Sequence, residues 1–223
     1  MERRICVVFD IDDTLYLERD YVKSGFEAVG RWAEKWLHIQ HFADICWTKF
    51  LSGSRRSIFN DVLQESGVES NAGLVSALVE IYRTHQPCIS LAPDVGKVLK
   101  AIRHTASIAV VSDGPATSQS QKVEALGLHS FAAPIILTEL LGSGFSKPHS
   151  RAFELVSQFH PDCAFVYVAD NPVKDFIAPK KLGWATVRVR RAAGMHYAVE
   201  NGAVIPDHEM CDCSRLTEVL AQL

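Results

Sequence analysis

Acidic side chains follow the first predicted strand of the chain at short, regular spacing. The apolar run from Ile5 to Phe9 ends at Asp10, and Asp12 and Thr14 follow two and four residues later. Side chains two positions apart on an extended backbone point the same way, so Asp10 and Asp12 are expected to serve one site with Thr14 behind them. One carboxylate of such a pair can be a nucleophile or metal ligand and the other an acid or base. The alternative interpretation is a polar turn after a strand, because Asp is common in turns.

Other polar residues stand where further apolar runs end, or on a loop between them. These candidates are Ser112, Asp113, Lys147, Asp170, Asn171 and Asp175. Ligands of open α/β sheets bind outside the carboxyl ends of the strands, so we expect these side chains and the first acids to gather at one edge. Several carboxylates together suit a hard cation such as Mg²⁺, which prefers oxygen ligands. A lysine, a serine hydroxyl and the N–H groups of a turn could bind an anionic group beside it.

Strands and helices alternate through the second half of the chain. Apolar patterns predict strands at 107–111, 133–137, 164–168 and 185–189. Helical spacing is predicted at 95–102, 116–126, 151–159 and 176–182. With the first strand, this alternation predicts an α/β fold with a doubly wound parallel sheet. The chain from residue 190 is expected to be irregular until a last helix at 214–220.

The segment between the first strand and this alternating region has a different pattern. It stays helical to about residue 85 and reads as four short amphipathic helices, which can form a small bundle. We therefore expect residues 19–87 to form a helical domain, and residues 1–18 and 88–223 to form the α/β core domain.

Composition excludes several classes of protein. Of the 223 residues, 48% are hydrophobic and 22% charged, as in an ordinary globular protein. The net charge of −3 gives no electrostatic case for a nucleic acid or an anionic membrane as partner. No apolar run approaches the ~20 residues that span a bilayer, and a strand so near the start leads us to expect no signal peptide. Six cysteines without a C-x-x-C pair indicate reduced thiols, so we expect a cytoplasmic monomer or homodimer.

Taken in order, the polar groups at the strand ends resemble the four motifs of the haloacid dehalogenase superfamily. Each motif alone is weak, but the ordered set spans almost the whole chain and is strongly specific. The dehalogenases of this superfamily lack the metal and the second acid of the first motif. Because this chain keeps Asp12 and a full acidic fourth motif at Asp170 and Asp175, it resembles the phosphatase branch. Many members also carry a helical cap inserted after the first motif, which closes over the site and selects the substrate.

The resemblance implies a role for each motif residue. Asp10 would attack phosphorus and form an aspartyl-phosphate, and Asp12 would protonate the leaving oxygen and then activate water. Mg²⁺ would be held by Asp10, Asp170 and the backbone carbonyl of Asp12.

The remaining motif positions would support this chemistry. Ser112 and Lys147 match the pair that binds the phosphate, and Asp175 matches the acid that positions the metal ligand or a bound water. Asp113 and Asn171 lie beside motif positions and are expected to assist in phosphate binding and in shaping the site.

The expected function is therefore that of a Mg²⁺-dependent phosphomonoesterase acting on a small soluble phosphate ester, such as a sugar phosphate or a nucleotide. Two alternatives stay open. A phosphotransferase or phosphomutase on the same scaffold would return the phosphoryl group to a substrate instead of water. A non-catalytic regulatory protein is the other, although retention of the acids, Ser112 and Lys147 argues against it.

Two groups of basic residues lie outside the motifs. Arg55 and Arg56, between two predicted helices, could reach a substrate anion, but a solvated helix start is the more ordinary interpretation. A second group is expected to lie on a solvated sheet edge. Its members are Lys180, Lys181, Arg188, Arg190 and Arg191.

Overall fold

The computed structural model describes residues 4–200 and 202–222, which divide into two compact units. Residues 1–18 and 90–223 form one unit, and residues 19–89 form the other. The division falls two residues later than residue 87, the expected end of the helical segment. Cys88 remains with the helical unit because its backbone N–H donates to the Ser24 hydroxyl at 2.9 Å.

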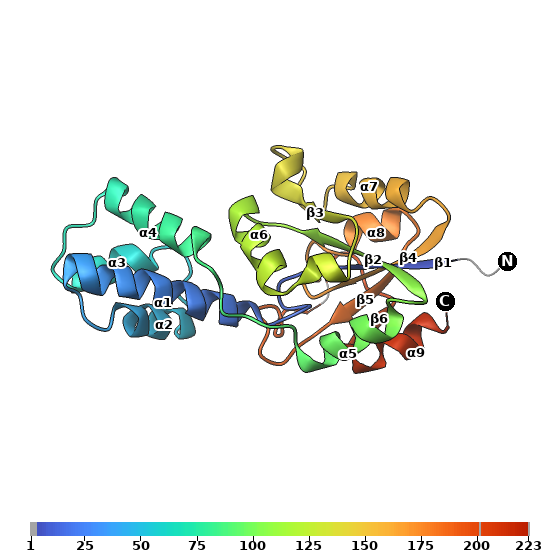
Figure 1. Cartoon of the computed structure of the whole chain (residues 1–223), viewed down its shortest axis with the longest axis horizontal. Coiled ribbons are helices and arrows are strands. Elements are labelled where there is room, and N and C mark those ends of the chain that lie inside the picture. The colour runs from blue at the N-terminus through green and yellow to red at the C-terminus, as the bar shows by residue number, and fades with distance from the viewer. Residues whose placement is uncertain (1–3, 201, 223) are drawn as a thin grey trace. The chain divides into compact units, whose positions relative to one another are not determined.

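The larger unit is built on one parallel sheet, as Figure 1 shows. Its strands are β1 (Arg4–Phe9), β2 (Ala106–Ser112), β3 (Ile135–Leu137), β4 (Cys163–Ala169), β5 (Ala185–Val189) and β6 (His208–Met210). They lie in the order β3-β2-β1-β4-β5-β6, and every neighbouring pair is parallel. The predicted α/β fold with a doubly wound parallel sheet is confirmed.

Helices cover both faces of the sheet. They are α5 (Pro93–Ile102), α6 (Ala116–Ala125), α7 (Arg151–Phe159), α8 (Ile177–Lys181) and α9 (Leu216–Leu220). Figure 1 shows α7 and α8 on one side of the sheet and α5 and α9 on the other. Successive strand side chains alternate between the two faces, so a strand covered on both sides must be apolar throughout. β1 fits this rule, since its residues from Cys6 to Phe9 are at most 1% exposed.

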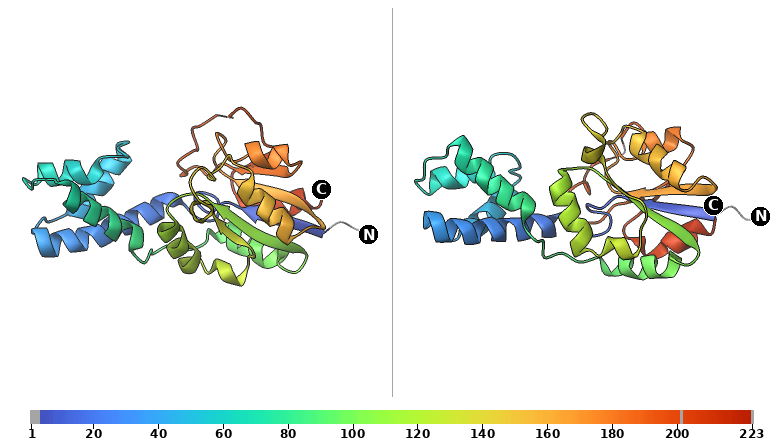
Figure 2. Two further views of the ribbon diagram at one scale, coloured as in Figure 1. Left: turned by 90° about the horizontal axis from the view of Figure 1, so that it is seen from above. Right: turned by 45° about the horizontal axis from the view of Figure 1, so that its top comes forward.

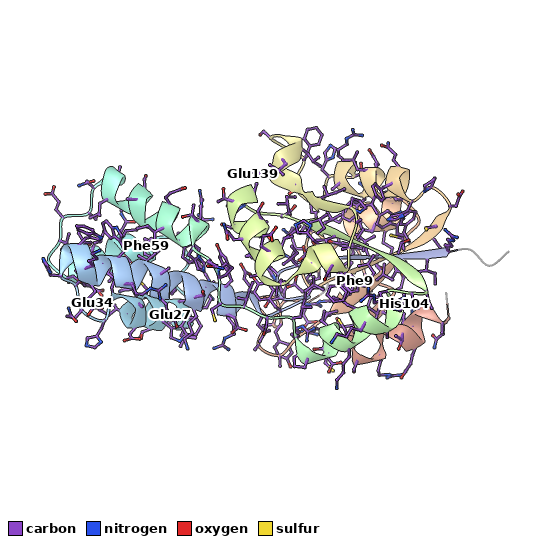
Figure 3. The ribbon with its side chains drawn as sticks, in the orientation of Figure 1. Phe9, Glu27, Glu34, Phe59, His104 and Glu139 are labelled. Carbon is purple, nitrogen blue, oxygen red and sulfur yellow. The ribbon has the colours of Figure 1, made fainter. Side chains whose placement is uncertain are left out.

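The central position of β1 decides where the first acid lies. Phe9, labelled in Figure 3, pairs with Val110 of β2 and with Val168 of β4. The next residue, Asp10, donates its backbone N–H to the carbonyl of Val168 at 2.9 Å. Asp10 therefore leaves the middle of the sheet at its carboxyl edge, with strand ends on both sides of it.

The chain after residue 190 is more ordered than its pattern indicates. The expectation of irregular structure up to residue 214 is wrong, because β6 pairs in parallel with β5. This strand has three residues, His-Glu-Met, and is too short and too polar to show strand alternation.

The expectation that the basic cluster lies on a solvated edge is wrong for its central member. Arg188 of β5 is fully buried, because β6 covers the edge that β5 would otherwise form. Its guanidinium donates to the carbonyls of Asp170, His196 and Val199 and to the carboxylate of Glu209. Arg188 thus ties the segment after β5 to the end of β4.

The smaller unit contains α1 (Glu18–Leu37, whose first residue belongs to the larger unit), α2 (Phe42–Leu51), α3 (Ile58–Glu65) and α4 (Ala72–Thr84), which Figure 2 shows from two further directions. Phe26 of α1 contacts the rings of Phe50, Phe59 and Tyr82, so each of the other helices adds an aromatic ring to one cluster. Figure 3 shows Phe59 among these helices. A Cβ on Gly25 would lie 2.4 Å from the Tyr82 ring, so the close approach of α1 and α4 requires glycine there.

Arg55 has a local role in this unit. Its guanidinium lies 4.2 Å from the centre of the Phe50 ring and donates to the carbonyls of Phe50 and Ser54 at 2.6 and 2.7 Å. These bonds close the turn after α2. Contact of Arg55 or Arg56 with a substrate stays a prediction.

All six cysteines are free thiols, as expected. Four of them are buried, and Cys88 and Cys211 are exposed. Within residues 4–200 and 202–222, we find no helix that combines the length and the apolar character needed to cross a membrane.

A partly buried ion pair fastens the C-terminal segment to α5. Asp94 at the start of α5 accepts from both Nη atoms of Arg191, at 3.2 and 2.8 Å, and from the backbone N–H of Cys213 at 2.8 Å. Although burial opposes ionisation, the bonds from Arg191 and Cys213 hold the pKa of Asp94 below its usual range. Arg191 also donates to the backbone carbonyl of Thr14, so this pair joins three distant parts of the chain.

We predict that Asp94→Asn lowers the free energy of unfolding at pH 7 by about 1–3 kcal/mol, since it leaves the partly buried Arg191 without its charged partner. An Asp whose folded pKa is depressed adds stability above its unfolded pKa and loses it as the pH falls through the folded value. The difference between wild type and variant should therefore be constant above about pH 5 and shrink below about pH 4.

Urea denaturation across this pH range measures the difference. Glu218→Gln is the control, because Glu218 forms an exposed ion pair with Arg215, and such pairs contribute about 0–1 kcal/mol. Equal effects of the two substitutions at pH 7 would contradict the assigned role of Asp94.

Candidate active site

The polar strand ends meet at one pocket of about 330 Å³ at the carboxyl edge of the sheet. Its lining includes six of the residues singled out in the sequence: Asp10, Asp12, Asp113, Asp170, Asn171 and Asp175. Glu18, Gly114, Lys174 and His196 complete the lining. Ser112 and Lys147 lie behind this surface, and both are buried.

A buried ammonium group lies at the base of the pocket. Lys147 Nζ donates to Asp10 Oδ1 at 2.7 Å and to the Tyr167 hydroxyl at 3.0 Å, and it lies 2.9 Å from Asp175 Oδ1. Burial opposes the charge of Lys147, but the carboxylates of Asp10 and Asp175 raise the pKa of its ammonium well above the usual value. Lys147 is therefore a permanent cation in contact with the first and last acids of the site.

One cation does not balance the acids around it. Asp10, Asp170 and Asp175 each offer an oxygen, and these three atoms lie within 4.8 Å of one another. Burial raises the pKa of Asp10 to about 7 even though the charge of Lys147 acts in the opposite direction, and the neighbouring carboxylates add to the rise. Burial also raises the pKa of Asp170. Asp10 and Asp170 therefore resist being charged together unless further positive charge is present.

A divalent cation fits this arrangement. The ligand atoms are all carboxylate oxygens, which Mg²⁺ prefers, and a dipositive ion would balance the excess negative charge. Asp175 Oδ1 is a buried oxygen that has no directed hydrogen bond within the described residues, only its charge contact with Lys147. Such an atom is available as a metal ligand. The backbone carbonyl of Asp12 stays a predicted ligand.

Asp12 lies in a different environment from Asp10. Lys122 Nζ donates to both of its carboxylate oxygens at 2.6 and 2.8 Å, Gln119 Nε2 donates to Oδ2 at 3.0 Å, and the Tyr16 hydroxyl donates to Oδ1. Burial would raise the pKa of Asp12, but the charge of Lys122 and the hydrogen bonds from all three side chains hold it below the usual range. The pKa values of the two acids of the first motif are thus shifted in opposite directions.

The residues after β2 are held by hydrogen bonds inside the protein. The Ser112 hydroxyl donates to Gln119 Oε1 at 3.0 Å. Asp113 accepts from the Thr138 hydroxyl, from the backbone N–H of Lys147 and from Lys174 Nζ. Asp113 therefore fixes the loop that carries Lys147 and places Lys174 on the pocket wall.

The residues after β4 are joined to the segment after β5. Val173 N–H donates to Asn171 Oδ1, which directs Asn171 Nδ2 towards His196 Nε2 at 3.1 Å. His196 Nδ1 then donates to Asp170 Oδ2 at 2.8 Å. Asp175 Oδ2 accepts from the backbone N–H of Asn171 and closes the turn.

Thr14 does not line the pocket. Its side chain is fully buried, and its hydroxyl has no hydrogen-bond partner within the described residues. The expectation that Thr14 stands behind the two acids stays a prediction, as does its role.

Comparison with known proteins places this site in a family. Residues 7–189 match the profile of the haloacid dehalogenase-like hydrolases. The chain belongs to this family. The resemblance drawn from the motifs is therefore confirmed, and the chain is a hydrolase.

Two named relatives and one solved structure are similar to this hydrolase over most of its length. A glyceraldehyde 3-phosphate phosphatase from Methanopyrus kandleri is 27% identical over 97% of this chain and 97% of the relative. An enzyme of the same name from Methanocaldococcus jannaschii is 27% identical over 82% of this chain and 83% of the relative. The HAD-hydrolase YfnB from Bacillus subtilis, solved bound to magnesium, has a TM-score of 0.68 and 18% identity, covering 98% of this chain and 99% of that one. The last similarity concerns the fold alone.

Several residues of the hydrolase site were not found from the sequence. They are Tyr16, Glu18, Gln119, Lys122, Lys174 and His196. The sequence of α6 did indicate that this helix buries polar side chains, because it contains few apolar residues. The buried residues of α6 are Ser118, Gln119, Lys122 and Val123. A helix that packs on a sheet but has so few apolar residues must bury polar ones, and buried polar side chains need partners. His196 gave no signal, because the segment that carries it has no regular pattern.

We predict that Asp10→Asn stabilises the hydrolase in chelator at pH 8. In the unfolded chain Asp10 loses its proton near pH 4, whereas the folded protein retains it up to about pH 7. The folded state is therefore penalised progressively as the pH rises from about 4 to 7, and an amide at this position removes the penalty.

The gain in the free energy of unfolding should be present at pH 8 and absent near pH 4. Urea denaturation with chelator at both pH values measures it. Asp162→Asn, which changes an exposed carboxylate of the same unit, serves as the control. An Asp10→Asn protein less stable than wild type at pH 8 would show that the bond to Lys147 outweighs the burial of Asp10.

Proposed function

We propose that this hydrolase is a Mg²⁺-dependent phosphomonoesterase that works through an aspartyl-phosphate on Asp10. The observation that carries the proposal is the cluster of Asp10, Asp12, Asp170 and Asp175 in one pocket, with Lys147 behind its surface and bonded to Asp10. This cluster combines a nucleophile, a fixed cation and an acid or base, which are the groups that phosphoryl transfer needs.

Asp10 is placed to attack. Its carboxylate lies at the pocket while its backbone is fixed to β4, so the nucleophile has little freedom to turn away. An oxygen of Asp10 forms a bond to phosphorus as the bond from phosphorus to the ester oxygen breaks. Lys147 holds the other side of the carboxylate and balances negative charge that accumulates on the phosphoryl group.

Asp12 serves the oxygen that leaves and the water that follows. Protonated Asp12 gives its proton to the ester oxygen as the bond from phosphorus to that oxygen breaks, and the carboxylate that remains then takes a proton from the water that hydrolyses the aspartyl-phosphate. The reaction returns Asp10 and Asp12 to their starting states and releases an alcohol and inorganic phosphate.

Asp10, Asp170 and Asp175 would hold the metal ion. When bound, Mg²⁺ would favour the ionised forms of these acids and neutralise charge on the phosphoryl oxygens. Arg188 and His196 fix the backbone and the side chain of Asp170, so this ligand is oriented by the protein itself.

We infer that the substrate is a small phosphorylated sugar metabolite. The support is the name of the two relatives, glyceraldehyde 3-phosphate phosphatases, which align with most of this chain. We assign the role of a substrate-selecting cap to residues 19–89, since this unit follows the first motif directly and has its own core.

The purified protein is expected to release phosphate from glyceraldehyde 3-phosphate with Mg²⁺, and to lose this activity in chelator. Asp10→Asn should be inactive because no nucleophile remains. Asp12→Asn should keep a trace, because general acid–base catalysis contributes about 10²–10⁴-fold and the nucleophile is intact. Full activity in chelator, or substantial turnover by Asp10→Asn, would contradict the assignment.

Product analysis separates hydrolysis from phosphoryl transfer. A phosphatase releases phosphate and alcohol in equal amounts, whereas a transferase or mutase with a sugar acceptor forms a new ester. A new phosphate ester formed faster than free phosphate would favour the transferase.

A further inference from the structure

The carboxylate of Asp12 is surrounded by hydrogen-bond donors that the proposed reaction does not use. Two bonds from Lys122 and one each from Gln119 and Tyr16 reach its two oxygens. A carboxylate has about four acceptor positions, so these bonds occupy all of them. Such an environment both fixes the group and leaves no position open for a substrate proton.

Lys122 is the strongest of these contacts. Its side chain is 3% exposed, and a lysine is seldom buried this deeply unless its charge is paired. It donates to both oxygens of Asp12, so it restricts rotation of the carboxylate as well as its position. The bond between them links residues 110 positions apart in the sequence.

Gln119 lies three residues before Lys122 on the same face of α6, and it connects two parts of the site. Its Oε1 accepts from the Ser112 hydroxyl, and its Nε2 donates to Asp12 Oδ2. The approach is close, since a Cβ on Gly114 would lie 2.9 Å from Gln119 Nε2. Glu139, labelled in Figure 3, accepts from the first N–H of α6 at 2.6 Å and anchors the helix one turn before Gln119.

The Ser112 hydroxyl has a single proton to donate. The motif resemblance assigns Ser112 to the phosphate. When its hydroxyl donates a hydrogen bond to a phosphate oxygen, it can no longer donate to Gln119 Oε1. Gln119 is therefore the donor that can move away when phosphate is bound, while Lys122 retains its hold on Asp12.

We propose that Lys122 and Gln119 are positioning residues for Asp12, with Lys122 as the permanent brace and Gln119 as the one released when Ser112 binds phosphate. This inference rests on the proposed function, because it concerns the acid–base role of Asp12. Through α6, the hydrolase couples occupation of the phosphate site to the availability of its acid.

The test uses two esters that differ in their need for an acid. The alkyl ester glyceraldehyde 3-phosphate has a poor leaving group and needs a proton from Asp12, whereas 4-nitrophenyl phosphate has a good leaving group and needs it far less. The measured quantity is the kcat/KM for the alkyl ester divided by the kcat/KM for the aryl ester. Lys122→Met should lower this ratio by about ten- to a hundredfold, because general acid catalysis supplies about 10²–10⁴-fold and this variant should lose part of it. Gln119→Leu should change the ratio in the same direction by a smaller factor. The ratio is independent of the fraction of protein that is folded.

Three further variants complete the design. Lys122→Arg should restore part of the ratio, because it keeps a donor with positive charge. In the Asp12→Asn background Lys122→Met should lower the ratio no further, since residues that act through one another are not additive. Lys100→Met is the matched control, because Lys100 is an exposed lysine on α5 in the same unit. The alkyl-to-aryl ratio of this variant should equal that of wild type.

The possible failures are distinct. A wild-type protein that hydrolyses neither ester with Mg²⁺ overturns the proposed function and this inference with it. An active protein whose Lys122→Met variant keeps the wild-type ratio, or loses both esters equally, overturns this inference alone. Additive effects of Lys122→Met and Asp12→Asn on the ratio would also overturn it.

Discussion

The site depends on the buried ammonium group of Lys147, which lies among several buried acids. Lys147 contacts Asp10 and Asp175, with Asp170 close by, and all four side chains are nearly or fully inaccessible to water. Burying unpaired charge is costly, so this arrangement has a small margin and is sensitive to any added or removed charge. The same imbalance makes the pocket attractive to a divalent cation. Under the proposed function, the stability of the metal-free protein and the reactivity of the metal-bound protein would both follow from this one electrostatic arrangement.

The surrounding structure can be understood as support for this arrangement. The apolar interior of β1 brings Asp10 to the middle of the sheet edge, and parallel neighbours bring Ser112 and Asp170 to the same edge. The segment after β5 adds a second set of constraints. The guanidinium of Arg188 donates to the backbone carbonyl of His196 in this segment, and the His196 side chain bonds to Asp170. The backbone N–H of Met195 donates to Asp13, beside the first motif. A stretch without regular secondary structure therefore contributes directly to the geometry of the site.

The fold and the motif acids were predictable because they follow from local patterns. An apolar run that ends in an acid marks a strand end, and parallel strands bring such ends together wherever they occur in the chain. Strand β5 was predicted at its observed bounds, Ala185–Val189. Side chains that reach the site from helices or irregular segments were not predictable in this way. The contacts of Lys122 and His196 depend on how α6 and the segment after β5 pack. The low apolar content of α6 indicates that it buries polar side chains, but not which partners they find. Arg188 resembled a surface charge because the strand that covers it, β6, has only three residues and no apolar alternation to predict it from the sequence.

The most direct test of this account is to identify the residue that carries the phosphoryl group during turnover. Borohydride reduces an aspartyl-phosphate to homoserine, so protein quenched with borohydride during hydrolysis of glyceraldehyde 3-phosphate can be digested and sequenced by mass spectrometry. The account predicts homoserine at position 10, unmodified Asp at position 12, and more homoserine in the Asp12→Asn variant, where hydrolysis of the intermediate is slowed. Continued turnover with Asp10 never modified, or homoserine at position 12, would contradict the assignment of Asp10 as the nucleophile.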